Sequence, residues 1–220
     1  MVMSGRERLT REKVLDAAMA LASVDGLDGL SMRRLARTLG VEAMSLYNHV
    51  ANKTDLLDGI AERVFAQVEP ADPAMPWAQR VRATVLNLYR ALSRQPVVPL
   101  ALVTDRANPT SAAALKPFDD ITGALYEAGF DDVAVRQALN GLTSLLFGAL
   151  LSATLGFTRE SARRPDAGQI DPYLRGVDPA ELPNFGRLLP TLGAAEPEHD
   201  FAHALDLLLR GLVAAVPDRA

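Results

Sequence analysis

The sequence predicts an all-α protein of two domains, and three observations support this prediction. Hydrophobic residues make up 49% of the 220 positions and aromatic residues only 5%, and the abundance of alanine and leucine favours helices over a sheet. Apolar residues recur at helical spacing through most of the chain. A proline-rich break, EPADPAMP at residues 69–76, separates an N-terminal domain (residues 1–68) from a C-terminal helical domain (residues 77–216).

Residues 31–50, SMRRLARTLGVEAMSLYNHV, have the pattern of two short helices joined at a glycine. Ser31 can cap the first helix, which carries apolar residues on one side and three arginines on the other: Leu35, Ala36 and Leu39, then Arg33, Arg34 and Arg37. Gly40 reaches the left-handed conformation without steric cost. It can therefore end this helix and redirect the chain within a few residues, as a helix-turn-helix requires.

In the expected second helix, Leu46 and Val50 lie one turn apart and can anchor it to the core. The opposite side has no aliphatic stripe to bury and carries Met44, Ser45, Tyr47 and Asn48. Such a face suits the major groove of DNA, where base edges and thymine methyl groups are read. An ordinary helical hairpin with a polar outer face is the alternative.

The flanking segments favour the DNA-binding interpretation, because they supply the other helices of a three-helix domain. Thr10 can cap an upstream helix that ends at Asp25 and Gly26, and Asn52 can cap a downstream one. Both expected helices carry apolar residues at helical spacing: Val14, Ala17, Ala18 and Leu21 in the first, and Leu56, Leu57, Ile60, Val64 and Phe65 in the second. A hairpin alone needs neither.

Residues 10–68 resemble the N-terminal domain of the TetR family of transcriptional regulators. The most specific parts are GLSMRRLA, LGV and SLYNHVANK, which begin at residues 29, 39 and 45. The resemblance implies that Arg33, Ala43, Met44 and Ser45 face bases and that Tyr47, His49 and Lys53 contact phosphates. Ser31, Met32 and Asn48 complete the expected DNA-binding set. In the tetracycline-repressor branch the positions of Ala43 and Met44 carry glutamine and proline, so we do not expect a shared operator.

Charge is distributed unevenly along the chain. The net charge is −4, but residues 1–53 hold eight Lys and Arg against six Asp and Glu. Affinity for the DNA backbone depends on a few local phosphate contacts, for which the candidates are Arg6, Arg8, Arg11, Arg33, Arg34 and Lys53. The alternative for any one of these arginines is that it is an ordinary solvated surface residue and does not contact a phosphate.

Cysteine is absent, which excludes disulfides, thiolate nucleophiles and zinc–thiolate sites. Residues 1–8 contain no apolar core of a signal peptide and read as a mobile basic arm. We therefore expect a cytoplasmic protein.

The second domain should begin with a helix over residues 77–94, followed by a short one at 100–103 between prolines. A helix from 108 to 128 should bend at Pro117, because an interior proline removes a hydrogen bond. Residues 159–197 should be mostly loop, with a short helix near 185–192.

Residues 137–158 contain no charged side chain and predict a helix that is either membrane-spanning or buried on nearly all sides. Its polar and glycine residues favour burial. The family resemblance implies that this helix, over 132–157, pairs with the last helix, over 198–216, across a two-fold axis in a homodimer. Its expected contacts are Leu145, Ala149, Ala153, Leu205, Leu208 and Leu212. A core within one chain is the alternative.

The resemblance also implies a small-molecule inducer in the second domain, where Trp77, Gly129 and Gly148 are spaced as in the tetracycline-repressor branch. Positions that match the family cavity include Thr84, Leu88, Phe118 and Phe147, although such side chains can equally be plain core. Asp105 and Ser152 occupy the places of that branch's metal-linked histidine and glutamate, so we expect no metal and no cofactor. His199 and His203 have the spacing of a helical metal pair but lack a clear third ligand.

These observations predict a ligand-responsive regulator of transcription, a repressor that a small-molecule inducer releases from a palindromic DNA operator. An enzyme is the first alternative, and the sequence shows no phosphate-binding glycine loop and no nucleophile beside a histidine base. A helical interaction module that has lost DNA binding is the second.

Overall fold

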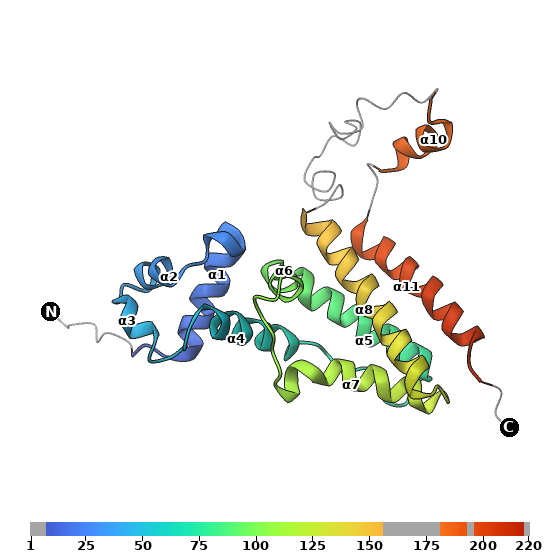
Figure 1. The fold of residues 1–220 in the computed structure, drawn as a ribbon, viewed down its shortest axis with the longest axis horizontal. Helices are drawn as coiled ribbons and strands as arrows, with labels where there is room; N and C mark the ends of the chain where they lie inside the picture. The colour runs from blue at the N-terminus through green and yellow to red at the C-terminus, as the bar shows by residue number, and fades with distance from the viewer. Residues whose placement is uncertain (1–7, 156–180, 193–195, 218–220) are drawn as a thin grey trace. The chain divides into compact units, whose positions relative to one another are not determined.

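The computed structural model describes residues 8–155, 181–192 and 196–217, and these ranges contain helices and loops but no strand (Figure 1). The all-α prediction is confirmed. The helices in chain order are α1 (Arg11–Gly29), α2 (Met32–Leu39), α3 (Ala43–Leu46), α4 (Lys53–Phe65), α5 (Trp77–Ser93), α6 (Val97–Val103), α7 (Ala112–Glu127), α8 (Asp132–Leu155), α10 (Pro183–Leu192) and α11 (Pro197–Ala214).

The chain forms two compact units, each described here by itself. The first unit combines residues 1–68 with residues 91–116, and the second combines residues 69–90 with residues 117–220. The segment that contains α6 therefore belongs with the helix-turn-helix by its contacts, although the sequence analysis assigns it to the C-terminal domain. The predicted division into 1–68 and 77–216 stays a prediction.

In the first unit, α1 packs against α2, α4 and α6, and α4 also packs against α6. The buried side chains follow the helical spacing seen in the sequence: Val14, Leu15 and Ala18 from α1, Leu35 and Ala36 from α2, and Leu56, Leu57, Ile60 and Val64 from α4. Burial of these faces, rather than the intrinsic propensity of such short helices, holds the unit together.

All three predicted helix caps of the first unit are present. Thr10 Oγ1 accepts from the backbone N–H of Lys13 at 3.3 Å, and Ser31 Oγ accepts from that of Arg34 at 3.3 Å. Asn52 Oδ1 accepts from the N–H of Asp55 at 2.9 Å. Each cap satisfies one of the backbone N–H groups that the first turn of a helix leaves unpaired.

Two glycines of the first unit have positive φ. Gly26, at φ 69°, interrupts α1 where the sequence predicts its end, and a last turn continues to Gly29. Gly40, at φ 65° and ψ 32°, ends α2 in the left-handed conformation as expected. Its N–H and that of Val41 satisfy carbonyls at the end of α2, and residues 40–42 then lead directly into α3.

In the second unit, α8 packs against α11, and the two helices lie side by side (Figure 1). Tyr89 of α5 stacks on Phe201 of α11 with ring centroids 4.3 Å apart. Arg82 of α5 forms a bidentate pair with Asp206 of α11 at 2.6 and 3.1 Å. The pairing fixes α5 beside α11 both by aromatic contact and by charge.

Helix boundaries agree with the sequence in most places. The helix predicted at 77–94 is α5, and the short helix predicted near 185–192 is α10. The helix predicted from 108 instead starts at Ala112, because Ser111 Oγ accepts from the N–H of Ala114 at 3.3 Å. Pro117 lies inside α7, and the bend there stays a prediction. Most of the loop predicted over 159–197, and the N-terminal arm, lie outside the described residues.

The expectation that α8 is buried on nearly all sides is wrong for the single chain. By length and composition, residues 132–154 are the one membrane-length apolar helix in the described ranges, and only 28% of its most apolar stretch is buried. The buried positions, such as Leu142, Leu146 and Leu150, recur every four residues and so occupy one side. Much of the other side of α8 is exposed or partly exposed in the described part of the chain.

Replacing Gly40 with alanine should lower the free energy of unfolding by about 1 kcal/mol, because the left-handed conformation is strained for any residue with a Cβ atom. No atom lies within 4 Å of the added Cβ, so the cost is purely conformational. Gly123→Ala in α7 is the matched control, since its Cβ also meets nothing and φ is helical. That change should stabilise by about 0.5 to 1 kcal/mol. Denaturant unfolding measures both values, and a Gly40→Ala protein as stable as wild type would contradict this account.

Candidate nucleic-acid interface

The expected second helix of the helix-turn-helix is shorter in the structure than in the prediction. Helix α3 covers only Ala43–Leu46, and its first residue follows Glu42, which makes no side-chain cap. Residues 47–50 continue it as a tight turn, in which Tyr47 N–H donates to Met44 O at 3.2 Å and His49 N–H to Leu46 O at 2.8 Å. We call residues 43–50 the recognition segment.

The recognition segment has a buried side and an exposed side, as predicted. Leu46 and Val50 are buried in the first unit, whereas Met44 is 75% exposed and Tyr47 45% exposed. Asn48 is exposed, while Ala43, Ser45 and His49 are partly exposed. An uncovered methionine and tyrosine beside small polar groups can contact base edges and thymine methyl groups without any rearrangement of the core.

Two of the candidate arginines have an ion-pair partner within the first unit, and their phosphate contacts stay a prediction. Arg11 pairs with Asp55, and Arg34 pairs with Asp25 at 2.7 Å. Arg33 and Arg37 are exposed on α2, and the described residues give neither of them an ion-pair partner. Arg6 lies outside the described residues. Among the candidate arginines in the described part of the chain, Arg8 and Arg33 are therefore the exposed ones without an ion-pair partner there.

Two further predicted residues, Lys53 and Ser31, also have roles within the protein. Lys53 Nζ donates to the carbonyl oxygen of Leu27 at 3.3 Å, which ties the start of α4 to the end of α1. An ammonium group has three donors, so this bond leaves Lys53 able to contact a phosphate. Ser31 caps α2, and Met32 beside it is partly exposed.

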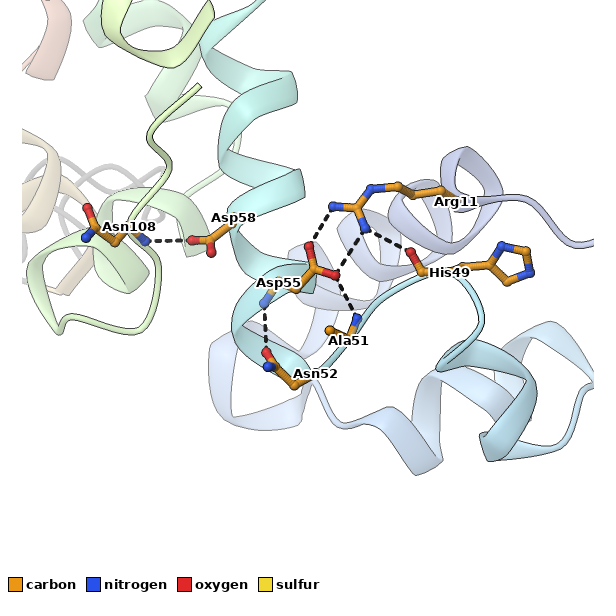
Figure 2. Close-up of polar contacts among 7 residues, drawn as sticks. All are labelled: Arg11, His49, Ala51, Asn52, Asp55, Asp58 and Asn108. Atoms are coloured by element: carbon orange, nitrogen blue, oxygen red, sulfur yellow. Dashed lines mark hydrogen bonds and ion pairs between the residues drawn. The ribbon is translucent and has the colours of Figure 1, made fainter. Parts of the chain in front are cut away.

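A cluster of polar contacts that the sequence analysis missed fixes the end of the recognition segment (Figure 2). Arg11 Nη2 donates to Asp55 Oδ1 at 2.8 Å, and Arg11 Nη1 donates to Asp55 Oδ2 at 3.2 Å. The same Nη1 donates to the carbonyl oxygen of His49 at 2.8 Å, and Asp55 Oδ2 accepts from the N–H of Ala51 at 2.7 Å. We call these four residues the Arg11–Asp55 latch.

The latch shifts the pKa values of its charged members. Hydrogen bonds from Arg11 lower the pKa of Asp55, helped by the N–H of Ala51 and opposed by partial burial. The hydrogen bond to Asp55 likewise raises the pKa of Arg11. Both groups are therefore charged at neutral pH, which keeps every donor and acceptor of the latch in place.

One helical turn beyond Asp55, α4 holds the segment that follows α6. Asp58 Oδ1 accepts from the N–H of Asn108 at 2.6 Å (Figure 2). Arg106 pairs with Asp28 at 3.3 Å, and Asp105 has a positive φ of 54°. Residues 105–108 are thus bound to both α1 and α4 within the first unit.

In the second unit, the predicted ligand positions divide by burial. Thr84 and Leu88 are buried on α5, and Phe118 and Phe147 are partly exposed. Thr84 is the one buried polar side chain among the described residues. A separate open groove of about 510 Å³ lies between α5 and α11, lined by Ala78, Gln79, Arg82, Asp206, Leu209, Arg210, Val213 and Ala214.

His199 and His203 are both exposed on α11. Within the described ranges, no group of three or more histidine, cysteine, aspartate or glutamate side chains is placed to hold a metal ion. The two histidines therefore remain without an assigned role.

The predicted dimer contacts need one correction. Leu205 is fully buried in its own chain together with Phe201 and Leu209, so it faces the core of the second unit and is not available to a partner. In the sequence, α11 carries one wide apolar stripe. Only the packing of α11 against α8 shows which residues of the stripe face the core and which are exposed. Leu207, which the sequence analysis omitted, is 53% exposed.

Acidification should weaken the first unit through Asp55. Because the folded-state pKa of Asp55 lies below its unfolded value, its contribution to stability is present above the unfolded pKa and is lost as pH falls through the folded pKa. Wild type should therefore lose more unfolding free energy than Asp55→Asn between pH 7 and about pH 3, the latter lying below the ordinary carboxyl pKa. Urea titrations at the two pH values measure this, and equal losses in both proteins would refute the assignment.

The comparisons with known proteins agree with this architecture. The chain matches the model of bacterial regulatory proteins of the tetR family over residues 14–60 and that of the tetracyclin repressor-like C-terminal domain over residues 69–216. The tetracycline repressor protein class D of Escherichia coli is 30% identical over 215 residues, which cover 93% of this chain and 89% of that protein.

Two solved structures from Streptomyces coelicolor show the same fold. A possible TetR family transcriptional regulator has a TM-score of 0.78 and 29% identity, and the match covers 93% of this chain and 99% of that one. The TetR family protein ActR in complex with (S)-DNPA has a TM-score of 0.70 and 26% identity, with 95% and 99% covered. The chain therefore belongs to the TetR family and is a ligand-responsive, DNA-binding regulator of transcription.

Proposed function

We propose that this protein is a homodimeric repressor that binds a roughly palindromic operator and leaves it when a small-molecule inducer binds the second unit. The observation that carries the DNA-binding part is the division of the recognition segment. Leu46 and Val50 anchor it in the core, while Met44 and Tyr47 stay uncovered. Large exposed apolar groups on so short a segment have no partner within the unit, and a DNA groove provides one.

We assign base contacts to Arg33, Ala43, Met44 and Ser45 and phosphate contacts to Tyr47, His49 and Lys53, with Asn48 beside them. A bidentate arginine can distinguish guanine in the major groove, and the methionine and alanine side chains suit thymine methyl groups. Tyrosine and lysine can donate to phosphate oxygens, which fixes the register without reading sequence. Ser31 and Met32 lie next to these contacts at the start of α2.

The dimer is proposed from the uncovered sides of α8 and α11. From residue 141 onward, the exposed and partly exposed positions of α8 include a run of small or apolar residues: Gly141, Ser144, Leu145, Gly148, Ala149, Ser152 and Ala153. On α11 the exposed and partly exposed positions include Ala204, Leu207, Leu208, Gly211 and Leu212, with charged side chains such as Asp206 and Arg210 between them. Small residues allow two helix pairs to approach closely, and a two-fold axis is the commonest way to cover such a face.

The inducer site is proposed around Thr84, Leu88, Phe118 and Phe147, all within the second unit. A buried hydroxyl among apolar side chains gives an otherwise apolar site one polar contact for orientation. The structure of ActR with (S)-DNPA shows that a relative of similar fold forms such a complex. The class D relative is a tetracycline repressor. We propose no metal-dependent ligand contact for this chain, because Asp105 and Ser152 stand where that branch has its metal-linked histidine and glutamate.

DNA binding can be tested with a duplex that the wild-type protein selects from a random pool. Arg33→Ala should cost about 1 to 3 kcal/mol, mainly on the selected duplex, because a base contact is lost. Lys53→Ala should weaken binding to all duplexes alike and lower the salt slope by about one unit. Fluorescence anisotropy at several salt concentrations measures both effects. If neither change alters affinity or salt dependence, the interaction-module alternative becomes the better account.

Dimerisation can be tested at Gly148, which is exposed and whose added Cβ would meet no atom of its own chain. Gly148→Glu should therefore fold but yield monomers, because it places a charge at the closest approach of two chains. Gly123→Glu in α7 is the control, since Gly123 is equally open but lies outside the proposed interface. Sedimentation velocity distinguishes the states. A Gly148→Glu protein that remains a dimer would place the interface elsewhere.

A further inference from the structure

We propose that Arg11 and Asp55 are positioning residues for DNA recognition: they hold the backbone on both sides of Val50 so that Tyr47 and His49 face the phosphates. This inference rests on the proposed function and deepens it. It also reassigns Arg11, which is a candidate phosphate contact by sequence, to a role inside the protein.

The latch forms hydrogen bonds to two successive peptide groups of the backbone. The His49 carbonyl belongs to the peptide that precedes Val50, and the Ala51 N–H belongs to the peptide that follows it. Arg11 from α1 holds the first at 2.8 Å, and Asp55 from α4 holds the second at 2.7 Å. Because Arg11 and Asp55 also bind each other, the start of α1, the start of α4 and the end of the recognition segment form one connected set of bonds.

The recognition segment needs external support because it has little of its own. Helix α3 is one turn long, has no side-chain cap, and gives way to turn-type hydrogen bonds at Tyr47. A helix of this length is unstable in isolation. Burial of Leu46 and Val50 sets its depth in the unit, and the N–H groups of His49 and Val50 both donate to the carbonyl oxygen of Leu46. The latch adds hydrogen bonds from the His49 carbonyl to α1 and from the Ala51 N–H to α4.

The direction of His49 is consistent with this role. Its carbonyl points to the guanidinium group of Arg11, while its imidazole ring points away from the latch (Figure 2). Fixing the carbonyl therefore fixes the side from which the ring leaves the backbone. Tyr47 lies two residues earlier in the same turn, so its exposed ring is set by the same constraint.

The charge of Asp55 provides the decisive test. Positioning and simple electrostatics predict opposite changes in DNA affinity when this carboxylate is removed. Removing a carboxylate from a domain that meets a polyanion should strengthen DNA binding if only charge matters. If Asp55 positions the segment, its removal should weaken binding. Asp16 supplies the matched control, since it pairs with Arg63 and so also joins α1 to α4, but does not touch residues 49–51.

The experiment compares the full-length wild type with Asp55→Ala, Asp16→Ala, Arg11→Ala and the Arg11→Ala, Asp55→Ala double variant on a duplex that wild type selects from a random pool. Asp55→Ala and Arg11→Ala should each weaken binding about tenfold, the loss expected for one charge-assisted contact. The double variant should be no weaker than either single one, since the two act as a unit. Asp16→Ala should stay within twofold of wild type or bind more tightly.

The salt slope separates positioning from direct contact. Arg11→Ala should leave the slope unchanged, whereas loss of a phosphate contact would lower it by about one unit. Circular dichroism melting confirms that each variant is folded, and Arg11→Lys provides a variant that retains the charge but not the planar fork. It should bind as weakly as Arg11→Ala if the fork is required.

Several outcomes would overturn the proposal. The latch does not position the segment if Asp55→Ala binds DNA as tightly as wild type or more tightly. The same holds if the affinity loss of the double variant is the product of the two single losses, or if Arg11→Ala lowers the salt slope. If wild type itself selects no duplex, the proposed function fails instead. The two failures are therefore distinguishable.

Discussion

A recognition helix of one turn cannot hold its own orientation, and the rest of the first unit follows from that constraint. The first turn of a helix is unfavourable in free energy, and only the hydrogen bonds of several further residues offset it. Helix α3 ends at Leu46, before that offset is reached. Its direction must therefore come from other elements. Leu46 and Val50 are buried, α3 packs against α2, and the N-termini of α1, α2 and α4 are capped by Thr10, Ser31 and Asn52. The three caps and the packing of α1 on α2 and α4 are thus conditions for a defined DNA-facing surface.

Uncovered apolar surface identifies the two proposed interfaces by the same physical reasoning. On the recognition segment the surface is small, dominated by Met44 and Tyr47, and beside an exposed arginine at position 33. That combination suits a polyanion with methyl groups in its groove. On α8 and α11 the surface is longer and rich in leucine, alanine and glycine, and residues 137–154 of α8 contain no charged side chain. A second copy of the same surface is its natural complement.

The parts of the fold that the sequence predicted correctly depend on neighbours within one or two helical turns. Caps, the left-handed Gly40 and the apolar stripes are local, so residue types and spacing suffice. The Arg11–Asp55 latch joins residues 44 positions apart, and nothing in the pattern of either helix indicates which arginine meets which carboxylate. The sequence therefore suggested Arg11 and Arg34 as phosphate contacts, whereas the fold pairs both internally. Similarly, the stripe on α11 gave no sign that Leu205 faces inward and Leu207 outward.

Residues 91–116 join the two units along the chain. By its contacts this segment belongs to the first unit, yet it contains the last residues of α5, which begins in the second unit, and the first residues of α7, which ends there. Asp58 binds the segment at Asn108, one turn from Asp55 on the same helix. Asp58 and Asp55 lie one turn apart on α4, so the bond to Asn108 and the latch share one helix. Regulation by a ligand then requires no contact between ligand and DNA-binding residues, only a ligand-bound second unit that favours a different position of this segment.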